Sequence, residues 1–252
     1  MNKFTIIMAA VVIGFIAVIF MVREDTDRVE ADPSSHIVGE GTSGVTLIEY
    51  GDFQCPACGD YYPLINMVKS VYGDEISFQF RHYSLFGSFP NSMAAHLAAE
   101  AAGRQDKFFE MHDLLYERQR TWSESNNPRE VFEGYAEELE LDMEQFREDY
   151  GDPRTRAVVM ADLQRGNDQG VTGTPTFFIN EERIDNPTSA EDFFAIIDEY
   201  IERETGEPSQ NSPFSEDGEF DESVFDEEQP EMPPGFDVDE SIEGAPRTEE
   251  EQ

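Results

Sequence analysis

The stretch EYGDFQCPAC, residues 49–58, decides the interpretation of this chain, because its last four residues include both cysteines of the sequence. The residues before it are β-rich, and the residues after it follow a helical pattern, so the cysteines lie where a strand gives way to a helix. Two thiols two residues apart can close into a disulfide and open again. Cys55 and Cys58 therefore form a candidate redox centre rather than a crosslink between distant segments.

The position of the first cysteine predicts its chemistry. A helix that begins at Cys55 directs unpaired backbone N–H groups and the positive end of its dipole at the sulfur. These groups favour the thiolate, and the pKa of such a cysteine falls from about 8.5 to roughly 3.5–7.5. Pro56 suits the first turn because its missing N–H would have had no partner there. We expect Cys55 to be the exposed attacking thiolate, and the more buried Cys58 to resolve the mixed disulfide.

A CxxC pair has a second interpretation as half of a zinc site, which needs four ligands. The sequence has no second CxxC, and its four histidines stand apart in ordinary contexts, at His36, His82, His96 and His112. Packing on helices or at a strand end accounts for them, so we predict no metal site among them. A non-enzymatic protein that carries copper or another soft metal on the two thiols stays the alternative from another functional class.

Two further positions are unusual for their surroundings. Glu49 lies in a strand expected to be central, where desolvation raises a carboxyl pKa and allows proton exchange with Cys58. A solvent-facing or ion-paired position fits the residues around Glu49 equally well. Pro175 opens a strand, which is typical of a cis peptide bond or of an edge strand. A cis bond after Thr174 would leave its backbone free to pair with an extended peptide beside Cys55, and the sequence leaves the isomer open.

The apolar patterns predict an α/β domain over residues 45–203 with a block of helices inserted in its middle, over about 90–168. Strands are expected at 45–50, at 76–81 and just before residue 180, and the flanking helices after Cys55 and at about 190–203.

The N-terminal region has the composition of a membrane anchor. Residues 4–22 contain no charge, and a helix of that length spans roughly 28 Å, close to the hydrocarbon thickness of a bilayer. No small-residue cleavage pattern follows, so we interpret residues 1–22 as an uncleaved signal-anchor and residues 23–44 as a polar linker. A single CxxC that follows such an anchor favours a position outside the cytosol, where disulfides form and persist. We therefore expect a single-pass protein of the cell membrane with an extracytoplasmic domain.

Charge excludes one class of partner. The chain has 17 basic and 55 acidic residues and a formal net charge of -38. Such a surface repels phosphates, which argues against a nucleic-acid partner. Much of this charge lies in residues 204–252, which cannot bury enough apolar surface to fold and are predicted to be a disordered acidic tail. Its recurring phenylalanines, among them Phe214 and Phe220, are either docking motifs or parts of a solvated acidic brush, and we favour the brush.

Four blocks of sequence resemble the DsbA-like branch of the thioredoxin superfamily. They are LIEYGDFQCPAC, RHYSLFG, NSMAAHLAAEAAGRQDKFFEMHDLLYE and GVTGTPTFFIN, which follow one another in the order of that family over roughly residues 36–203. The resemblance implies a thioredoxin-like fold with an inserted helical subdomain. It also implies a protein disulfide oxidoreductase that needs no cofactor.

The same resemblance assigns catalytic roles. Cys55 takes the position of the nucleophile, Cys58 that of the resolving cysteine and Glu49 that of the buried acid. Pro63 matches a proline that kinks the active-site helix. The remaining implied positions contact the substrate, and they are Pro56, Ala57, Thr174 and Pro175.

The partners implied by the resemblance are cysteine-containing secreted or surface polypeptides and a separate membrane protein that reoxidises the disulfide. We expect an oxidase that acts as a monomer. A reductase or an isomerase is the alternative, because the Pro56-Ala57 pair between the cysteines departs from the Pro-His of the strongly oxidising members.

Overall fold

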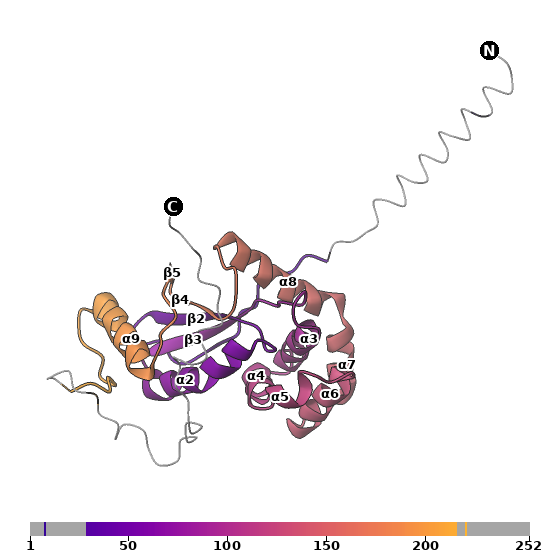
Figure 1. The fold of residues 1–252 in the computed structure, drawn as a ribbon, viewed down its shortest axis with the longest axis horizontal. Helices are drawn as coiled ribbons and strands as arrows, with labels where there is room; N and C mark the ends of the chain where they lie inside the picture. Colours follow the sequence, from indigo (N-terminus) through magenta and orange to yellow (C-terminus); the bar gives the residue numbers. More distant parts are fainter. Residues whose placement is uncertain (1–7, 9–28, 216–219, 221–252) are drawn as a thin grey trace. The chain divides into compact units, whose positions relative to one another are not determined.

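The computed structural model describes residue 8, residues 29–215 and residue 220. It divides into two units, Met1–Glu30 and Ala31–Gln252. The fold lies in the second unit (Figure 1). The predicted anchor at residues 1–22, apart from Met8, and most of the predicted acidic tail lie outside the described residues. Among the described residues, none of the helices is long and apolar enough to cross a bilayer.

A sheet in the order β1-β3-β2-β4-β5 forms the centre of the described fold. Its strands are β1 (Ile37–Val38), β2 (Val45–Gly51), β3 (Ile76–His82), β4 (Thr176–Ile179) and β5 (Glu182–Arg183). β2 runs parallel to β3 and antiparallel to β4, with Glu49 opposite Phe80 on one side and Phe177 on the other. The strand that carries Glu49 is therefore central, as the sequence predicts.

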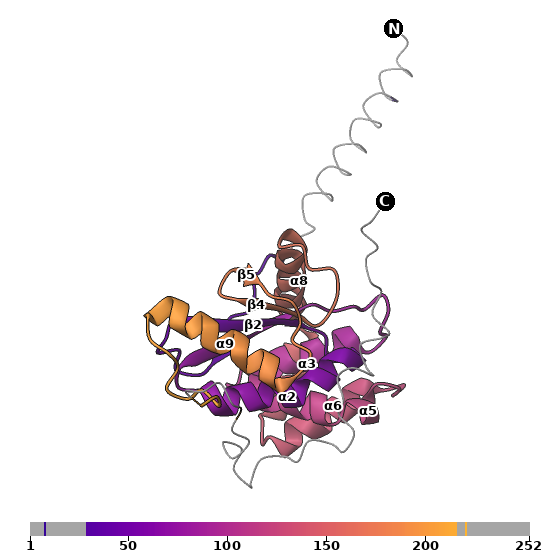
Figure 2. The same ribbon diagram turned by 60° about the vertical axis from the view of Figure 1, so that its left-hand side comes forward.

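The helices are α2 (Pro56–Tyr72), α3 (Ser92–Gly103), α4 (Phe108–Glu117), α5 (Gln119–Trp122), α6 (Pro128–Glu138), α7 (Met143–Gly151), α8 (Pro153–Asp168) and α9 (Ala190–Thr205). Those from α3 to α8 follow one another between β3 and β4, which confirms the predicted helical insertion (Figures 1 and 2). Asp142 caps α7, since its side chain accepts hydrogen bonds from the backbone N–H groups of Glu144 and Gln145.

Alternation along the strands separates two cores. Side chains that point to one face, such as Leu47, join the large core that also holds residues of α2, α4 and α9. Tyr50 points to the other face, where it packs with Phe178 and with Leu163 of α8. Glu49 shares the face of Leu47, so its carboxyl group lies inside the large core.

The structure corrects the predicted start of the domain. Residues 31–44 are not a free linker: β1 pairs with β3, and Ser34 is buried against Asp162 of α8. The polar residues that suggested a tether include Ser34, whose backbone N–H and hydroxyl group make these buried hydrogen bonds. Composition alone does not distinguish a polar segment with partners from one in solvent.

The C-terminal boundary also differs from the prediction. α9 continues to Thr205 and ends at Gly206, whose φ of 78° is the left-handed conformation that glycine adopts most easily. Beyond it, Ser209 hydrogen-bonds Glu75, and Phe214 packs against the large core, as Phe220 does. The prediction of disorder from residue 204 is therefore wrong for residues 204–215, because these residues find partners on the folded domain.

Candidate active site

The cysteine pair lies where β2 passes into α2. Cys55 is the N-cap of α2 in an extended backbone conformation, and Pro56 occupies the first turn, as the sequence predicts. Pro56 is exposed and Ala57 is half-buried. Asp52 fixes the connecting loop, since its carboxylate accepts hydrogen bonds from the backbone N–H groups of Gln54 and Leu85. The loop thus holds the sulfur of Cys55 at the helix N-terminus.

The two thiols have opposite electrostatic environments. A hydrogen bond from Cys58 lowers the pKa of Cys55 to about 6 against the effect of burial, and backbone N–H groups of Ala57 and Cys58 contribute. Burial raises the pKa of Cys58 well above its usual value. Cys58 is fully buried, as expected, but Cys55 is only 7 % exposed rather than an open thiol. At neutral pH the thiolate therefore lies mainly on Cys55, the sulfur nearer the surface.

The predicted proline loop lies directly beside Cys55. The Thr174–Pro175 peptide bond is cis, and the carbonyl oxygen of Thr174 is 3.4 Å from the sulfur of Cys55. Asn186 donates a hydrogen bond to the carbonyl of Pro175 at 3.0 Å and so supports the loop from behind. The structure thus brings together the two segments that the sequence separates by more than a hundred residues.

Glu49 is a buried acid without a hydrogen-bond partner among the described residues. Its side chain is fully buried, and neither carboxyl oxygen has a partner. Burial raises its pKa to about 8, while Lys69 opposes the shift and the Cys55 thiolate adds to it. A Cβ atom at Gly51 would lie 2.6 Å from the ring of Phe80 and 2.8 Å from Glu49 Oε1, so glycine leaves room for both side chains. Its charge also raises the pKa of Cys58, which places the acid close enough to influence that thiol.

Tyr116 completes the surroundings of this acid, and the sequence gave no reason to single it out. The pKa of Tyr116 is raised well above its usual value by burial first and then by the charge of Glu49. Its hydroxyl also lacks a hydrogen-bond partner among the described residues. The phenol therefore keeps its proton, and the charge of Glu49 acts on it without a hydrogen bond between the two groups.

Gln119 is a second residue that the sequence did not indicate. It lies in the short helix α5, and its side-chain amide donates to the backbone carbonyls of Phe53 and Cys55, each at 2.8 Å. The helical insertion thereby holds the active-site loop. Asp52 also holds this loop, and it lies within the stretch 49–58. Its position three residues before Cys55 is the one sequence feature that could have indicated this role.

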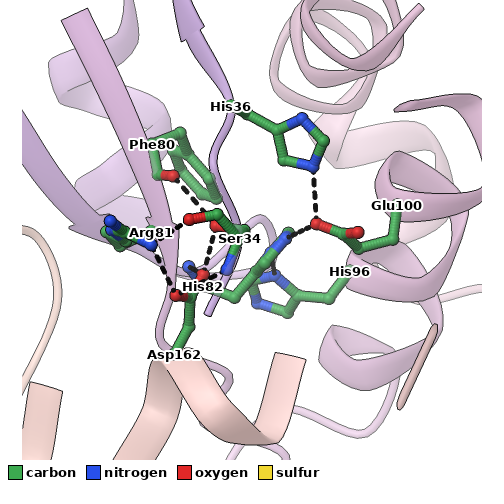
Figure 3. Close-up of polar contacts among 8 residues, drawn as sticks. All are labelled: Ser34, His36, Phe80, Arg81, His82, His96, Glu100 and Asp162. Carbon is green, nitrogen blue, oxygen red and sulfur yellow. Dashed lines mark hydrogen bonds and ion pairs between the residues drawn. The ribbon is translucent and has the colours of Figure 1, made fainter. Parts of the chain in front are cut away.

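The histidines correct a further prediction, because three of the four meet in one buried cluster (Figure 3). His36 and His82 each contact Oε1 of Glu100 at 2.7 Å, and His82 Nδ1 lies 2.7 Å from His96 Nδ1. Only the four-residue spacing of His96 and Glu100 on one helix hinted at this arrangement. His112 lies apart and hydrogen-bonds Asp113. The histidines are therefore not explained by separate packing roles.

Known proteins share this fold and its sequence pattern. The chain is 39% identical over 163 residues to the Na(+)/H(+) antiporter NhaA 1 of Salinispora arenicola, covering 65% of this chain and 23% of that protein. It is 36% identical over 177 residues to NhaA 3 of Salinispora tropica, covering 70% and 25%. The chain thus spans about a quarter of the length of the curated relatives that it matches.

Two solved structures resemble the fold. α-DsbA1 of Wolbachia pipientis aligns with a TM-score of 0.60 at 19% identity, covering 69% of this chain and 94% of that one. BdbD of Bacillus subtilis aligns with a TM-score of 0.56 at 22% identity, covering 71% and 98%. A family model described as thioredoxin matches residues 31–199. The chain accordingly belongs to the thioredoxin superfamily and has the DsbA-like form of its fold.

Proposed function

We propose that this protein is a membrane-anchored, extracytoplasmic thiol-disulfide oxidoreductase that oxidises cysteines of secreted or surface polypeptides. The observation that carries the proposal is the position of Cys55 at the N-terminus of α2, with a pKa lowered to about 6 and the Thr174–Pro175 loop 3.4 Å away. A stabilised thiolate beside an open backbone segment is what exchange with a bound peptide needs.

The exchange takes two steps. A substrate thiolate attacks the sulfur of Cys55, the bond between Cys55 and Cys58 breaks, and Cys58 leaves with the electron pair and takes up a proton. A second substrate thiolate then attacks the substrate sulfur of the mixed disulfide, and Cys55 leaves as a thiolate. The substrate gains a disulfide, and two electrons pass to the cysteine pair.

Each neighbour of the pair has a role in this scheme. Glu49, with its pKa near 8, gives a proton to Cys58 when that thiol leaves and accepts one when it attacks. The backbone of Thr174 pairs with the substrate peptide, and Pro56 and Ala57 border the same site.

The oxidising direction is supported by the low pKa of Cys55. A stabilised thiolate favours the reduced pair, and a pair that favours its reduced form is a stronger oxidant. A reductase or an isomerase uses the same residues with the opposite preference. The reduction potential of the pair against glutathione distinguishes them, because a poise near that of cytosolic thioredoxin would contradict the oxidase proposal.

The location and the partners rest on the sequence. The apolar residues 4–22 support a membrane anchor, and a single redox pair supports an extracytoplasmic domain, where a membrane partner reoxidises it. Antiport is not part of the proposal, because this chain spans about a quarter of the antiporters that it resembles. Protease digestion of intact cells tests the location, and an epitope beyond residue 30 that stays protected would contradict it.

Replacing Cys55 tests the activity itself. In Cys55→Ala, oxidation of a reduced dithiol peptide by the preoxidised protein should disappear, because the attacked sulfur is gone. Cys58→Ala is the matched control: it also has no disulfide to pass on, but its Cys55 thiolate should attack a peptide whose cysteine is already in a disulfide with a small thiol. The small thiol leaves, and the mixed disulfide with Cys55 should persist because Cys58 is not there to resolve it. Undiminished peptide oxidation by Cys55→Ala would refute the proposed function.

A further inference from the structure

Glu100 is a buried carboxylate on α3, only 5% exposed. Its Oε1 lies 2.7 Å from a ring nitrogen of His36 and 2.7 Å from a ring nitrogen of His82. A buried charge of this kind is normally paired with a fixed cation or bound to a metal ion.

No arginine or lysine pairs with Glu100 in the described part of the chain. Among the described residues, Glu100 forms ion pairs only with His36 and His82. The nearby guanidinium of Arg81 is engaged elsewhere, because it binds Asp162 and the carbonyl oxygen of Ser34 (Figure 3). Compensation of Glu100 must come from protons on imidazoles or from a cation held between them.

The ring of His82 lies in an apolar part of the core. Its side chain is fully buried, and the rings of Phe53, Phe80 and Phe108 surround it. A metal ion can supply positive charge there, because it binds neutral imidazole and brings its charge with it.

We propose that His36, His82 and Glu100 form a binding site for a divalent transition-metal ion, for which zinc is the best match. Two imidazoles and one carboxylate are a ligand set that zinc uses, with a water molecule in the fourth position. The three ligand atoms lie within 4.8 Å of one another. The site joins the segment before β1, the end of β3 and the helix α3.

Zinc binding would require the three ligand atoms to rearrange around the ion. Nε2 of each histidine lies 2.7 Å from Oε1 of Glu100. Around a tetrahedral zinc with bonds of about 2.0–2.2 Å, ligand atoms lie roughly 3.3 Å apart. Each nitrogen therefore needs to move roughly 0.6 Å away from Oε1, and the two nitrogens, which lie within 4.8 Å of each other, need to reach the same spacing of roughly 3.3 Å. The side chain of His36 is 20% exposed, so an ion can enter past this ring.

Both ligand rings are held from behind, which prepares the site. The ring of His36 stacks on Phe108 with centroids 3.6 Å apart, and Gly103 leaves the space for it, since a Cβ there would lie 2.7 Å from His36 Cε1. His82 contacts His96 through Nδ1, which leaves its Nε2 directed at Glu100. Outer contacts of this kind fix the ring orientation of metal-binding histidines.

Isothermal titration with zinc chloride tests the proposal on the full chain in which Cys55→Ser and Cys58→Ser remove the competing thiols. This parent should bind one equivalent of zinc. Adding His36→Ala should weaken binding at least 100-fold, and this partly exposed position is the least disruptive ligand to remove. His112→Gln, which removes the histidine outside the cluster, is the matched control and should bind as the parent does. Circular dichroism checks that each variant is folded.

Cobalt gives a second readout that does not depend on any change to the proposed ligands. Cobalt(II) added to the cysteine-free parent should produce the visible bands of a four-coordinate ion with nitrogen and oxygen ligands, and zinc should displace it. The proposal is wrong if the parent takes up neither metal, or if His36→Ala binds zinc as tightly as the parent.

Discussion

Glu49 and Glu100 are both buried glutamates of the same domain, yet they differ in ionisation. Glu49 has no hydrogen-bond partner among the described residues, and its pKa is raised to about 8. Glu100 accepts hydrogen bonds from His36 and His82, and its pKa is lowered to about 2. Burial acts in the same direction on both, so the partners decide the difference.

The same rule separates the two cysteines. Cys55 receives hydrogen bonds from Cys58 and from backbone N–H groups, and its pKa falls to about 6. Cys58 is buried with little compensation, and its pKa rises. The active site thus combines one stabilised anion, the Cys55 thiolate, with two groups that keep their protons, Cys58 and Glu49. Glu100 in the histidine cluster shows the opposite case, in which hydrogen-bond partners lower the pKa of a buried glutamate.

The largest expected effect is on the pH dependence of stability through Glu49. Below about pH 4.5 the folded and unfolded chains both carry the proton; between 4.5 and 8 only the unfolded chain releases it, so the contribution of Glu49 to stability falls as pH rises. Glu49→Gln does not titrate, so above pH 8 it should be more stable than the wild type by on the order of 5 kcal/mol.

Urea unfolding of both reduced proteins at pH 4, 6 and 9 measures this difference. The extra free energy of unfolding of Glu49→Gln over the wild type should be near zero at pH 4 and largest at pH 9. An equal difference at all three pH values would show that Glu49 does not carry a raised pKa.

The same substitution at Glu100 should have the opposite sign. A lowered pKa contributes stability that is present above about pH 4.5 and is lost as pH falls through about 2. Glu100→Gln should therefore destabilise the protein at pH 7 by on the order of 3 kcal/mol. Urea unfolding at pH 7 with a chelator present measures it without any metal contribution. A stabilised Glu100→Gln would contradict the role assigned to the two histidines.

The sequence predicted the active site far better than the histidine cluster. The positions of Cys55, Cys58, Glu49 and Pro175 followed from local signals, namely a CxxC at a strand-to-helix junction, an acid in a central strand and a proline opening a strand. The structure buries Cys58 as expected, but it leaves Cys55 only 7% exposed. The burial of Glu49 and the cis bond before Pro175 are alternatives that the sequence left open. Their chemical roles stay predictions until the variants are measured.

The cluster could not be predicted because its members share no local pattern. His36 lies in a segment whose composition indicated a linker, and only the fold brings it to His82 and Glu100. The start of the tail was wrongly predicted for the same reason: Phe214 lies in a polar segment that leads into acidic residues, but its side chain packs on the core. The composition of a segment indicates whether it can fold by itself, but it does not show whether another part of the fold provides contacts for it.

A variant of Cys58 tests whether hydrogen-bond partners also determine the pKa of Cys55. Cys58→Ala removes the hydrogen bond that contributes most to the lowered pKa of Cys55, so this pKa should rise from about 6 by at least one unit, which corresponds to about 1.4 kcal/mol. The rate of iodoacetamide alkylation against pH measures it, with Cys55→Ala as the control for slow labelling of Cys58. An unchanged midpoint would assign the shift to the backbone N–H groups instead.

The smallest expected effect separates the two partners of Glu100. His36 is 20% exposed on its side chain, so water can replace part of its hydrogen bond, whereas His82 is fully buried. Replacing His36 by Gln should therefore cost only about 1 kcal/mol at pH 7 with a chelator present, well below the effect of Glu100→Gln, because a hydrogen bond to a charged group contributes about 1.5–3 kcal/mol when shielded. Urea unfolding of the two variants side by side gives the ratio. If His36→Gln costs as much as Glu100→Gln, the outer histidine rather than the buried one stabilises the anion, and the cluster depends on the segment before β1.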